Sequence, residues 1–159
     1  MPRRYSFAFK LGCTQPDMNP ATYLKGSLRS KWLRGHNWSN ASRYMARLSR
    51  RLERRRKLRL LDYYALGKLI HYTVDAFTSA HNDHFPAQLQ AHRQYEDQLQ
   101  AYFLAYLRQC SPAPGCRSGK LMDAICSHHD EYILEPADIR TDSHYCVLVS
   151  SLILCILFA

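Results

Sequence analysis

The sequence has 159 residues, of which 47% are hydrophobic and 22% are charged, and this length and composition fit one globular domain with a buried core. It contains no internal repeat, low-complexity segment, Walker motif, glycine-rich nucleotide loop or nucleophile elbow, which excludes the classes that those features mark. The formal net charge of +9 favours anionic partners such as phosphates, anionic lipid headgroups or nucleic acid. Glycine and proline are few, and long stretches contain neither, so an all-α fold is predicted.

The six cysteines include no C-x-x-C pair, which excludes the usual thiolate metal site. Reduced thiols in a helical core are the preferred interpretation, and a disulfide that closes the loop between Cys110 and Cys116 is the alternative. The N-terminal residues are basic but form no sustained apolar region, so no secretory signal is predicted. A cytoplasmic or membrane-associated location is therefore expected.

The first twenty residues are predicted to contain no long helix. Residues 1–10 are basic and aromatic and predict a short lead-in, whereas residues 11–20 contain two prolines and a glycine and predict a loop. Asp17 lies between the two prolines, where its carboxylate could point inward at a fixed angle. The alternative is a turn aspartate that caps a short helix beginning at Pro20.

A short helix with a connector is predicted over residues 21–34, and a second loop over residues 35–40. This loop presents His36, which could be a metal ligand or could be solvated, as isolated loop histidines commonly are. A serine and an asparagine at the end of the loop can cap the next helix, which is predicted to reach about Arg56.

One face of that helix is basic, in a stretch that extends from Arg43 to Arg59. Apolar residues at helical spacing between Tyr44 and Leu52 predict the core-facing side. The basic face is interpreted as a solvated surface, and the alternative is a patch for an anionic membrane surface or for nucleic acid. The stretch has no interleaved aromatic residues of the kind on which bases stack.

Two helices joined by a loop are predicted for the middle of the chain. Residues 60–79 are apolar nearly all round, which predicts a central and mostly buried helix. Residues 80–86 form the loop, and the proline that ends it starts a second helix over residues 87–109.

Two further helices are predicted towards the end of the chain. On residues 120–134, the adjacent His128 and His129 point in different directions and are interpreted as surface residues. The last helix is predicted from about residue 139 to the end, and its final 14 residues are largely apolar, against the ~20 that span a bilayer. A buried bundle helix is predicted, and a tail that touches or enters a membrane is the alternative.

The most informative pattern is H-x3-D-x5-H-x10-H-x3-E, which comprises His71, Asp75, His81, His92 and Glu96. Its first two residues and its last two are spaced i,i+4, so each pair shares one helical face. Imidazole nitrogens and carboxylate oxygens held on rigid helices are ligands that suit zinc. A hydrogen bond between His71 and Asp75, without a metal, is the competing explanation.

This pattern and three sequence strings resemble the bacterial zinc-dependent phospholipase C family, which shares its fold with the fungal single-strand nucleases. The resemblance extends from about Leu11 to Phe103. It implies a compact multi-helix bundle around a polynuclear zinc site, with two zinc ions or three. The strings are LGCTQPDMNPATYLKGSLR, RGHNWSN and LGKLIHYTVDAFTSAHNDHF.

The resemblance also implies the metal ligands. By position, the first zinc would be held by Asp17, His36, His71 and Asp75. The second zinc would be held by His81, His92 and Glu96. In the family, the counterpart of Asp75 also bridges to a third zinc, completed by an amino terminus and by a histidine of the first helix. No histidine precedes His36 here, so residues 1–159 are expected to form a single domain that lacks that first helix, or to work with two metals.

The implied activity is hydrolysis of a phosphodiester by a zinc-activated water, because zinc lowers the pKa of bound water to about 7 and offsets charge on the phosphate. Asp17 is the candidate general base, by resemblance alone. The expected partners are a phospholipid or other phosphodiester substrate and an anionic membrane surface that binds the basic stretch, with no obligate protein partner. The alternatives are a single-strand nuclease of the same fold and a non-catalytic, metal-stabilised helical domain.

Overall fold

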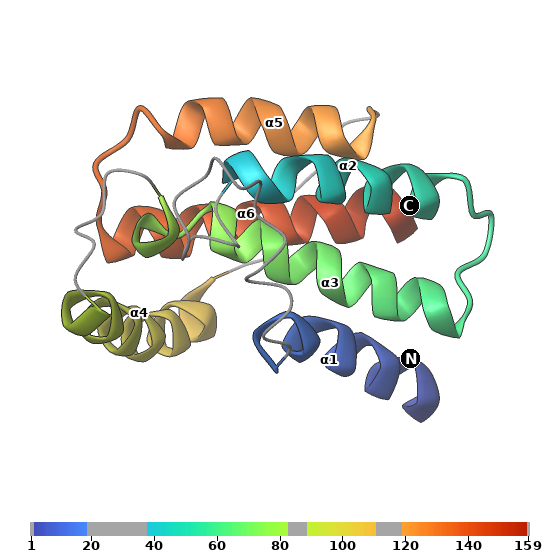
Figure 1. The fold of residues 1–159 in the computed structure, drawn as a ribbon, viewed down its shortest axis with the longest axis horizontal. Coiled ribbons are helices and arrows are strands. Elements are labelled where there is room, and N and C mark those ends of the chain that lie inside the picture. The colour runs from blue at the N-terminus through green and yellow to red at the C-terminus, as the bar shows by residue number, and fades with distance from the viewer. Residues whose placement is uncertain (1, 19–37, 83–88, 111–118, 159) are drawn as a thin grey trace.

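The computed structural model of the chain describes residues 2–18, 38–82, 89–110 and 119–158 (Figure 1). Over these residues the fold is all-α, as predicted, with helices and one 3-10 turn and no strand. The elements are α1 Arg3–Met18, α2 Trp38–Glu53, α3 Leu60–Ala76, the 3-10 turn η2 Ser79–His81, α4 Leu89–Gln109, α5 Leu121–Tyr132 and α6 Ile139–Phe158.

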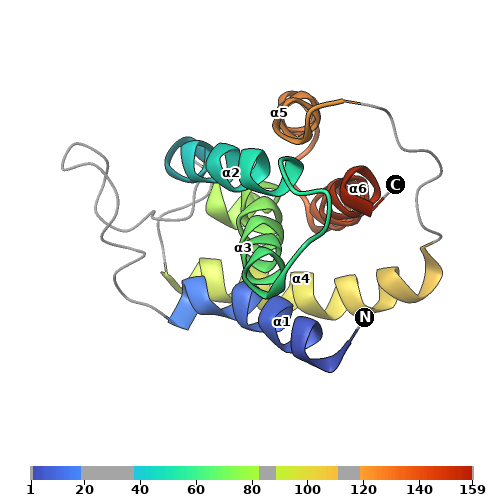
Figure 2. The same ribbon diagram turned by 90° about the vertical axis from the view of Figure 1, so that its right-hand side faces the viewer.

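Helix α3 is the central element of the bundle. It packs against α1, α2 and α6, which surround it when the molecule is viewed from the end (Figure 2). Its residues Ala65, Leu66, Leu69, Tyr72 and Ala76 are buried in the main core, which continues at Phe77 directly after the helix. Helix α5 covers α2 and α6, and α4 packs against α6 and η2. The prediction of a central helix is therefore confirmed, although Leu60 and Leu61 at its start are exposed.

Helix α1 corrects the predicted loop, because residues 11–18 continue the helix that begins at Arg3. The reason is the contact between α1 and α3, where a Cβ added to Gly12 would meet the carbonyl oxygen of Tyr64 and one added to Gly67 would meet that of Phe9. Two glycines thus allow the two helix backbones to touch. Pro16 is also buried in this helix, so tertiary packing outweighs the backbone hydrogen bond that a proline cannot make.

His129 corrects the prediction of two surface histidines. His128 is partly exposed and lies 3.2 Å from the Glu131 carboxylate, but His129 is only 4% exposed. Its ring stacks on Trp38 at a centroid distance of 3.8 Å and meets Phe77 edge-on. Within the described part of the chain, neither of its ring nitrogens has a hydrogen-bond partner. Among the described residues, His129 therefore behaves as a core aromatic residue that carries two unsatisfied polar atoms.

The burial of His129 predicts a pH-dependent stability. Burial lowers the pKa of His129 from 6.5 to about 4, although the Asp130 charge acts in the opposite direction. Between pH 6.5 and pH 4, His129 of the unfolded chain binds a proton that the native state excludes. The free energy of unfolding is therefore unaffected by protonation of this residue above pH 6.5 and decreases as pH falls towards 4. We expect the free energy of unfolding of the wild type to fall by about 3 kcal/mol relative to His129→Phe over that range.

The measurement is urea unfolding of both proteins at a series of pH values between 7 and 4. The comparison isolates His129, because the other histidines titrate in both proteins. Parallel curves for the two proteins would contradict the prediction.

Helix α6 is long and apolar enough to cross a membrane by length and composition, with a mean hydropathy of 1.6. Core helices of soluble proteins meet the same criterion. Its inner face, including Val149 and Ile153, is fully buried in the core, which agrees with the predicted bundle helix. On its outer side, Leu154 is 40% and Phe158 is 54% exposed.

The cysteines differ in state. Free thiols are found at Cys13, Cys110 and Cys126, and the buried Cys146 is also free. The predicted alternative of a bridge at Cys110 is therefore wrong. Cys155 is disulfide-bonded, so the preference for reduced thiols throughout is also wrong, although it holds for the four that are free.

Candidate metal centre

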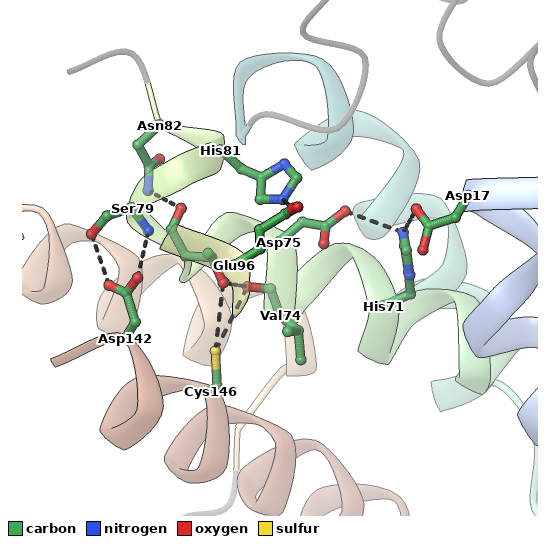
Figure 3. A network of polar contacts seen from close by, with 11 residues as sticks. Asp17, His71, Val74, Asp75, Ser79, His81, Asn82, Glu96, Asp142 and Cys146 are labelled. Atoms are coloured by element: carbon green, nitrogen blue, oxygen red, sulfur yellow. Dashed lines mark hydrogen bonds and ion pairs between the residues drawn. The ribbon is translucent and has the colours of Figure 1, made fainter. Parts of the chain in front are cut away.

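Helices α1 and α3 bring three of the predicted ligands together (Figure 3). His71 and Asp75 lie one turn apart on α3, and the His71 Nε2 atom is 3.1 Å from Asp75 Oδ2. The same nitrogen is 3.5 Å from Oδ1 of Asp17, in the last turn of α1. The side chains of His71 and Asp75 are only 9% and 13% exposed, whereas that of Asp17 is 62% exposed. The group is thus open to solvent at its aspartate from α1.

A second pair joins η2 to α4. His81 ends the 3-10 turn, and its Nε2 atom is 3.4 Å from Oε1 of Glu96. The His81 side chain is 23% exposed and that of Glu96 is 45% exposed. Residues far apart in the sequence therefore meet here because α4 packs against η2.

The carboxylates of the first group also act on the histidine of the second. Burial opposes protonation of His71, but its hydrogen bond to Asp75 and the charges of Asp75 and Asp17 outweigh burial and raise its pKa. The same balance raises the pKa of His81, where the hydrogen bond to Glu96 and the charges of Asp75, Glu96 and Asp17 outweigh burial. Three carboxylates that favour a proton on two imidazoles would also favour a metal cation in the place of that proton.

Imidazole nitrogens and carboxylate oxygens are the types of donor that zinc binds. A zinc ion with tetrahedral nitrogen and oxygen ligands at about 2.0–2.2 Å separates those ligand atoms by roughly 3.4 Å. The three nitrogen–oxygen separations in the cluster are 3.1, 3.4 and 3.5 Å. In addition, His71 makes a hydrogen bond to the backbone of Cys13, a contact of the kind that orients metal-binding histidines.

The complete ligand set is not assembled among the described side chains. Where side chains are described, no three histidine, cysteine, aspartate or glutamate residues converge closely enough to hold a metal ion. His36 lies outside the described residues, and for His92 the structure gives the backbone position in α4 but not the side chain. The structure therefore brings together His71 with Asp75 and Asp17, and His81 with Glu96, and it does not show the predicted polynuclear arrangement.

A comparison with known families decides which class of protein this is. A model of the zinc-dependent phospholipase C family matches residues 2–147, which is most of the chain. The chain belongs to the zinc-dependent phospholipase C family. No curated protein and no solved structure matches the sequence.

Membership in the zinc-dependent phospholipase C family confirms the family that the sequence resembles and the general kind of function, a phospholipase hydrolase that depends on zinc. The match begins before Leu11 and continues beyond Phe103, so it is longer than the resemblance. It includes every position of the predicted ligand set, from Asp17 to Glu96.

Asp142 is a functional candidate that sequence reasoning missed. It is fully buried in α6 and accepts hydrogen bonds from elements next to the candidate metal centre (Figure 3). The available signal was a carboxylate within a helix that is otherwise mostly apolar, because a buried carboxylate requires several hydrogen-bond donors.

Proposed function

We propose that this member of the family is a zinc-dependent phosphodiesterase that hydrolyses a phospholipid headgroup ester, with two zinc ions held by the seven predicted ligands. The observation that supports this proposal most directly is the pairing of His71 with two carboxylates and of His81 with a third. The ligands would be Asp17, His36, His71 and Asp75 for the first ion, and His81, His92 and Glu96 for the second.

The residues of the cluster have different roles in this proposal. When bound, zinc would supply a water of lowered pKa and a positive charge beside the phosphate. Asp75 and the backbone of Cys13 hold the His71 ring in place. Asp17 is the proposed general base, because its carboxylate is the most exposed of the five described side chains and can reach an incoming water. No protein nucleophile is required.

The test is hydrolysis of phosphatidylcholine vesicles by zinc-loaded protein, measured as the release of phosphocholine. Single-stranded DNA is the competing substrate in the same buffer. Release of phosphocholine without cleavage of DNA supports the proposal, and the reverse result selects a nuclease. No turnover of either substrate by protein that carries both metals would contradict a hydrolytic role, and unfolding on chelation would then indicate a structural one.

We further propose that an anionic membrane surface binds along α2. The two faces of α2 differ in character. Its buried face carries Ala41, Met45, Leu48 and Leu52. Four exposed arginines have the same i,i+4,i+7,i+11 spacing, but each lies two residues after a buried one, so they occupy the outer face. The last of them directly follows the helix. These residues, the arginine stripe, are Arg43, Arg47, Arg50 and Arg54.

The arginine stripe extends along the whole helix, so a flat membrane could contact all of it while the helix lies parallel to the surface. The N-terminal end of α2 lies near the C-terminal half of α3, which carries His71 and Asp75 (Figure 1). In this orientation the candidate metal centre lies towards one end of the contact with the bilayer. If the membrane instead contacted only the end of the bundle at which α3 begins, His71 would lie about 15 Å or more from the surface, because α3 rises about 1.5 Å per residue.

The arginine stripe predicts binding to anionic vesicles that depends on charge. Each arginine near a negatively charged bilayer contributes about 1 kcal/mol, so changing Arg43, Arg47 and Arg54 to glutamine is expected to weaken binding about a hundredfold. The measurement is sedimentation with vesicles that contain phosphatidylserine, at low and high salt.

A control with the same loss of charge uses three exposed arginines outside the stripe, Arg93→Gln, Arg108→Gln and Arg140→Gln. This control is expected to bind nearly as well as the wild type. If both triple variants bound vesicles equally weakly, vesicle binding would depend only on net charge, and the arginine stripe would not be the membrane-binding surface.

A further inference from the structure

Asp142 lies in the first turn of α6 and is fully buried. One carboxylate oxygen accepts hydrogen bonds from the Ser79 backbone N–H at 2.7 Å and from the Tyr95 hydroxyl at 2.7 Å. The other accepts hydrogen bonds from the Ser79 hydroxyl at 2.8 Å and from the Tyr132 hydroxyl at 2.8 Å. Four donors fill the four acceptor positions of a carboxylate, and no lysine or arginine in the described part of the chain pairs with it.

Two of these donors come from the elements that carry the second ligand group. Ser79 begins the 3-10 turn that ends with His81. Tyr95 immediately precedes Glu96 on α4. Because both elements are bonded to one carboxylate, Asp142 fixes their separation and therefore the approach of His81 Nε2 to Glu96 Oε1, which is 3.4 Å. The polar network beside the cluster is visible in Figure 3.

Helix α4 contributes little to the buried core among the described residues, so its polar contacts help to hold it in place. None of its side chains that the structure describes is fully buried, and among the described elements it packs mainly against α6 and η2. Its polar contacts with α6 include the Tyr95–Asp142 bond and, three turns later, a contact of 3.2 Å between the Tyr106 hydroxyl and His144 Nδ1. The first of these two contacts lies at the ligand end of α4.

We propose that Asp142 is a positioning residue for the second metal site, and that it acts by clamping η2 and α4 together through Ser79 and Tyr95. The inference rests on the proposed metal sites, but not on the identity of the substrate. Groups that orient metal ligands typically change metal affinity by 10–100-fold when they are removed.

The test is stepwise zinc affinity, measured by competition with a chromogenic chelator on the full chain after metal removal. Asp142→Asn and Tyr95→Phe are expected to weaken one of two zinc ions by 10–100-fold and to leave the other within about twofold. The visible spectrum of the cobalt-substituted protein should change for the weakened site only. Thermal unfolding of each variant confirms that the protein measured is folded.

The chain offers matched controls for both variants. Asp62 is another buried aspartate, 2% exposed, but it pairs with Arg51 and Arg55 at the opposite end of α3 from the cluster. Asp62→Asn is expected to lower stability without changing either zinc affinity. Tyr106→Phe removes a contact between the same two helices, α4 and α6, at a distance from the ligands, and is likewise expected to leave both affinities unchanged.

The outcomes separate this inference from the proposed function. Two zinc ions of unchanged affinity in Asp142→Asn and Tyr95→Phe would overturn it, as would equal weakening in the control variants. A wild type that binds fewer than two zinc ions would also overturn it. Selective weakening of one ion supports it even if the wild type hydrolyses no phospholipid, which would count against the proposed function alone.

Discussion

His71→Ala is expected to lower kcat/KM for phosphatidylcholine hydrolysis by about a thousandfold. The His71 nitrogen lies against both Asp75 and Asp17, so its removal leaves these two carboxylates facing each other without the imidazole that joins them. The first zinc would then lose one ligand and the fixed geometry of two others. Loss of a single preorganised donor commonly lowers the rate 10²–10³-fold, and a lost metal ligand should be at least as damaging.

The matched control is His128→Ala, which removes a partly exposed histidine that pairs with its helical neighbour Glu131. This variant should retain the wild-type rate and zinc content. Zinc content is measured alongside activity for both proteins, because His71→Ala should lose about one zinc per chain. Wild-type activity in His71→Ala would remove this residue from the site.

Gly67→Ala is expected to separate α1 from α3 and to lower activity about a hundredfold or more. A Cβ at Gly67 would overlap the carbonyl oxygen of Phe9, and backbone cannot move aside as a flexible side chain can. Overpacking of this kind costs about 3 kcal/mol of stability. Because Asp17 reaches His71 only through the packing of α1 on α3, a displacement of about 1 Å is sufficient to impair the chemistry.

Gly119→Ala is the control, because a Cβ at Gly119 would meet no atom of the described residues within 4 Å. It should leave stability, zinc content and activity unchanged. The experiment combines thermal unfolding with elemental analysis and a hydrolysis assay. A Gly67→Ala protein as stable and as active as the wild type would show that the close contact between α1 and α3 does not position Asp17.

Most of the helical bundle could be predicted from local sequence patterns. Helices α2 to α6 carry regular apolar spacing, and their observed limits lie within a few residues of those predicted, for example Leu60–Ala76 for the central helix. Helix α1 could not be recognised in this way, because Gly12 and Pro16 are residues that usually mark a loop. Gly12 instead lies against the backbone of α3, and Pro16 is buried. Both features depend on tertiary packing, which local patterns do not contain.

In the candidate site, too, contacts between residues close in the sequence could be predicted, whereas contacts that depend on tertiary packing could not. The i,i+4 spacing of His71 and Asp75 predicts their contact, and the structure has it at 3.1 Å. The approach of Asp17 depends on tertiary packing, and only the family resemblance indicated it. Asp142 was missed because its partners lie on other elements, far from it in the sequence. His129 is a different case, because it lies at helical spacing on the same buried face of α5 as Leu121, Ile125 and Tyr132, so that local pattern could have indicated its burial.

The most direct test of the account is the metal content of the protein, determined by elemental analysis after purification without added metal and without a histidine tag. The account predicts two or more zinc ions per chain in the wild type. It also predicts loss of about one ion in His71→Ala and a weaker second ion in Tyr95→Phe. A folded wild-type protein that contains no zinc, and that takes up none when zinc is supplied, would contradict it and would reduce the cluster to hydrogen-bonded helix residues.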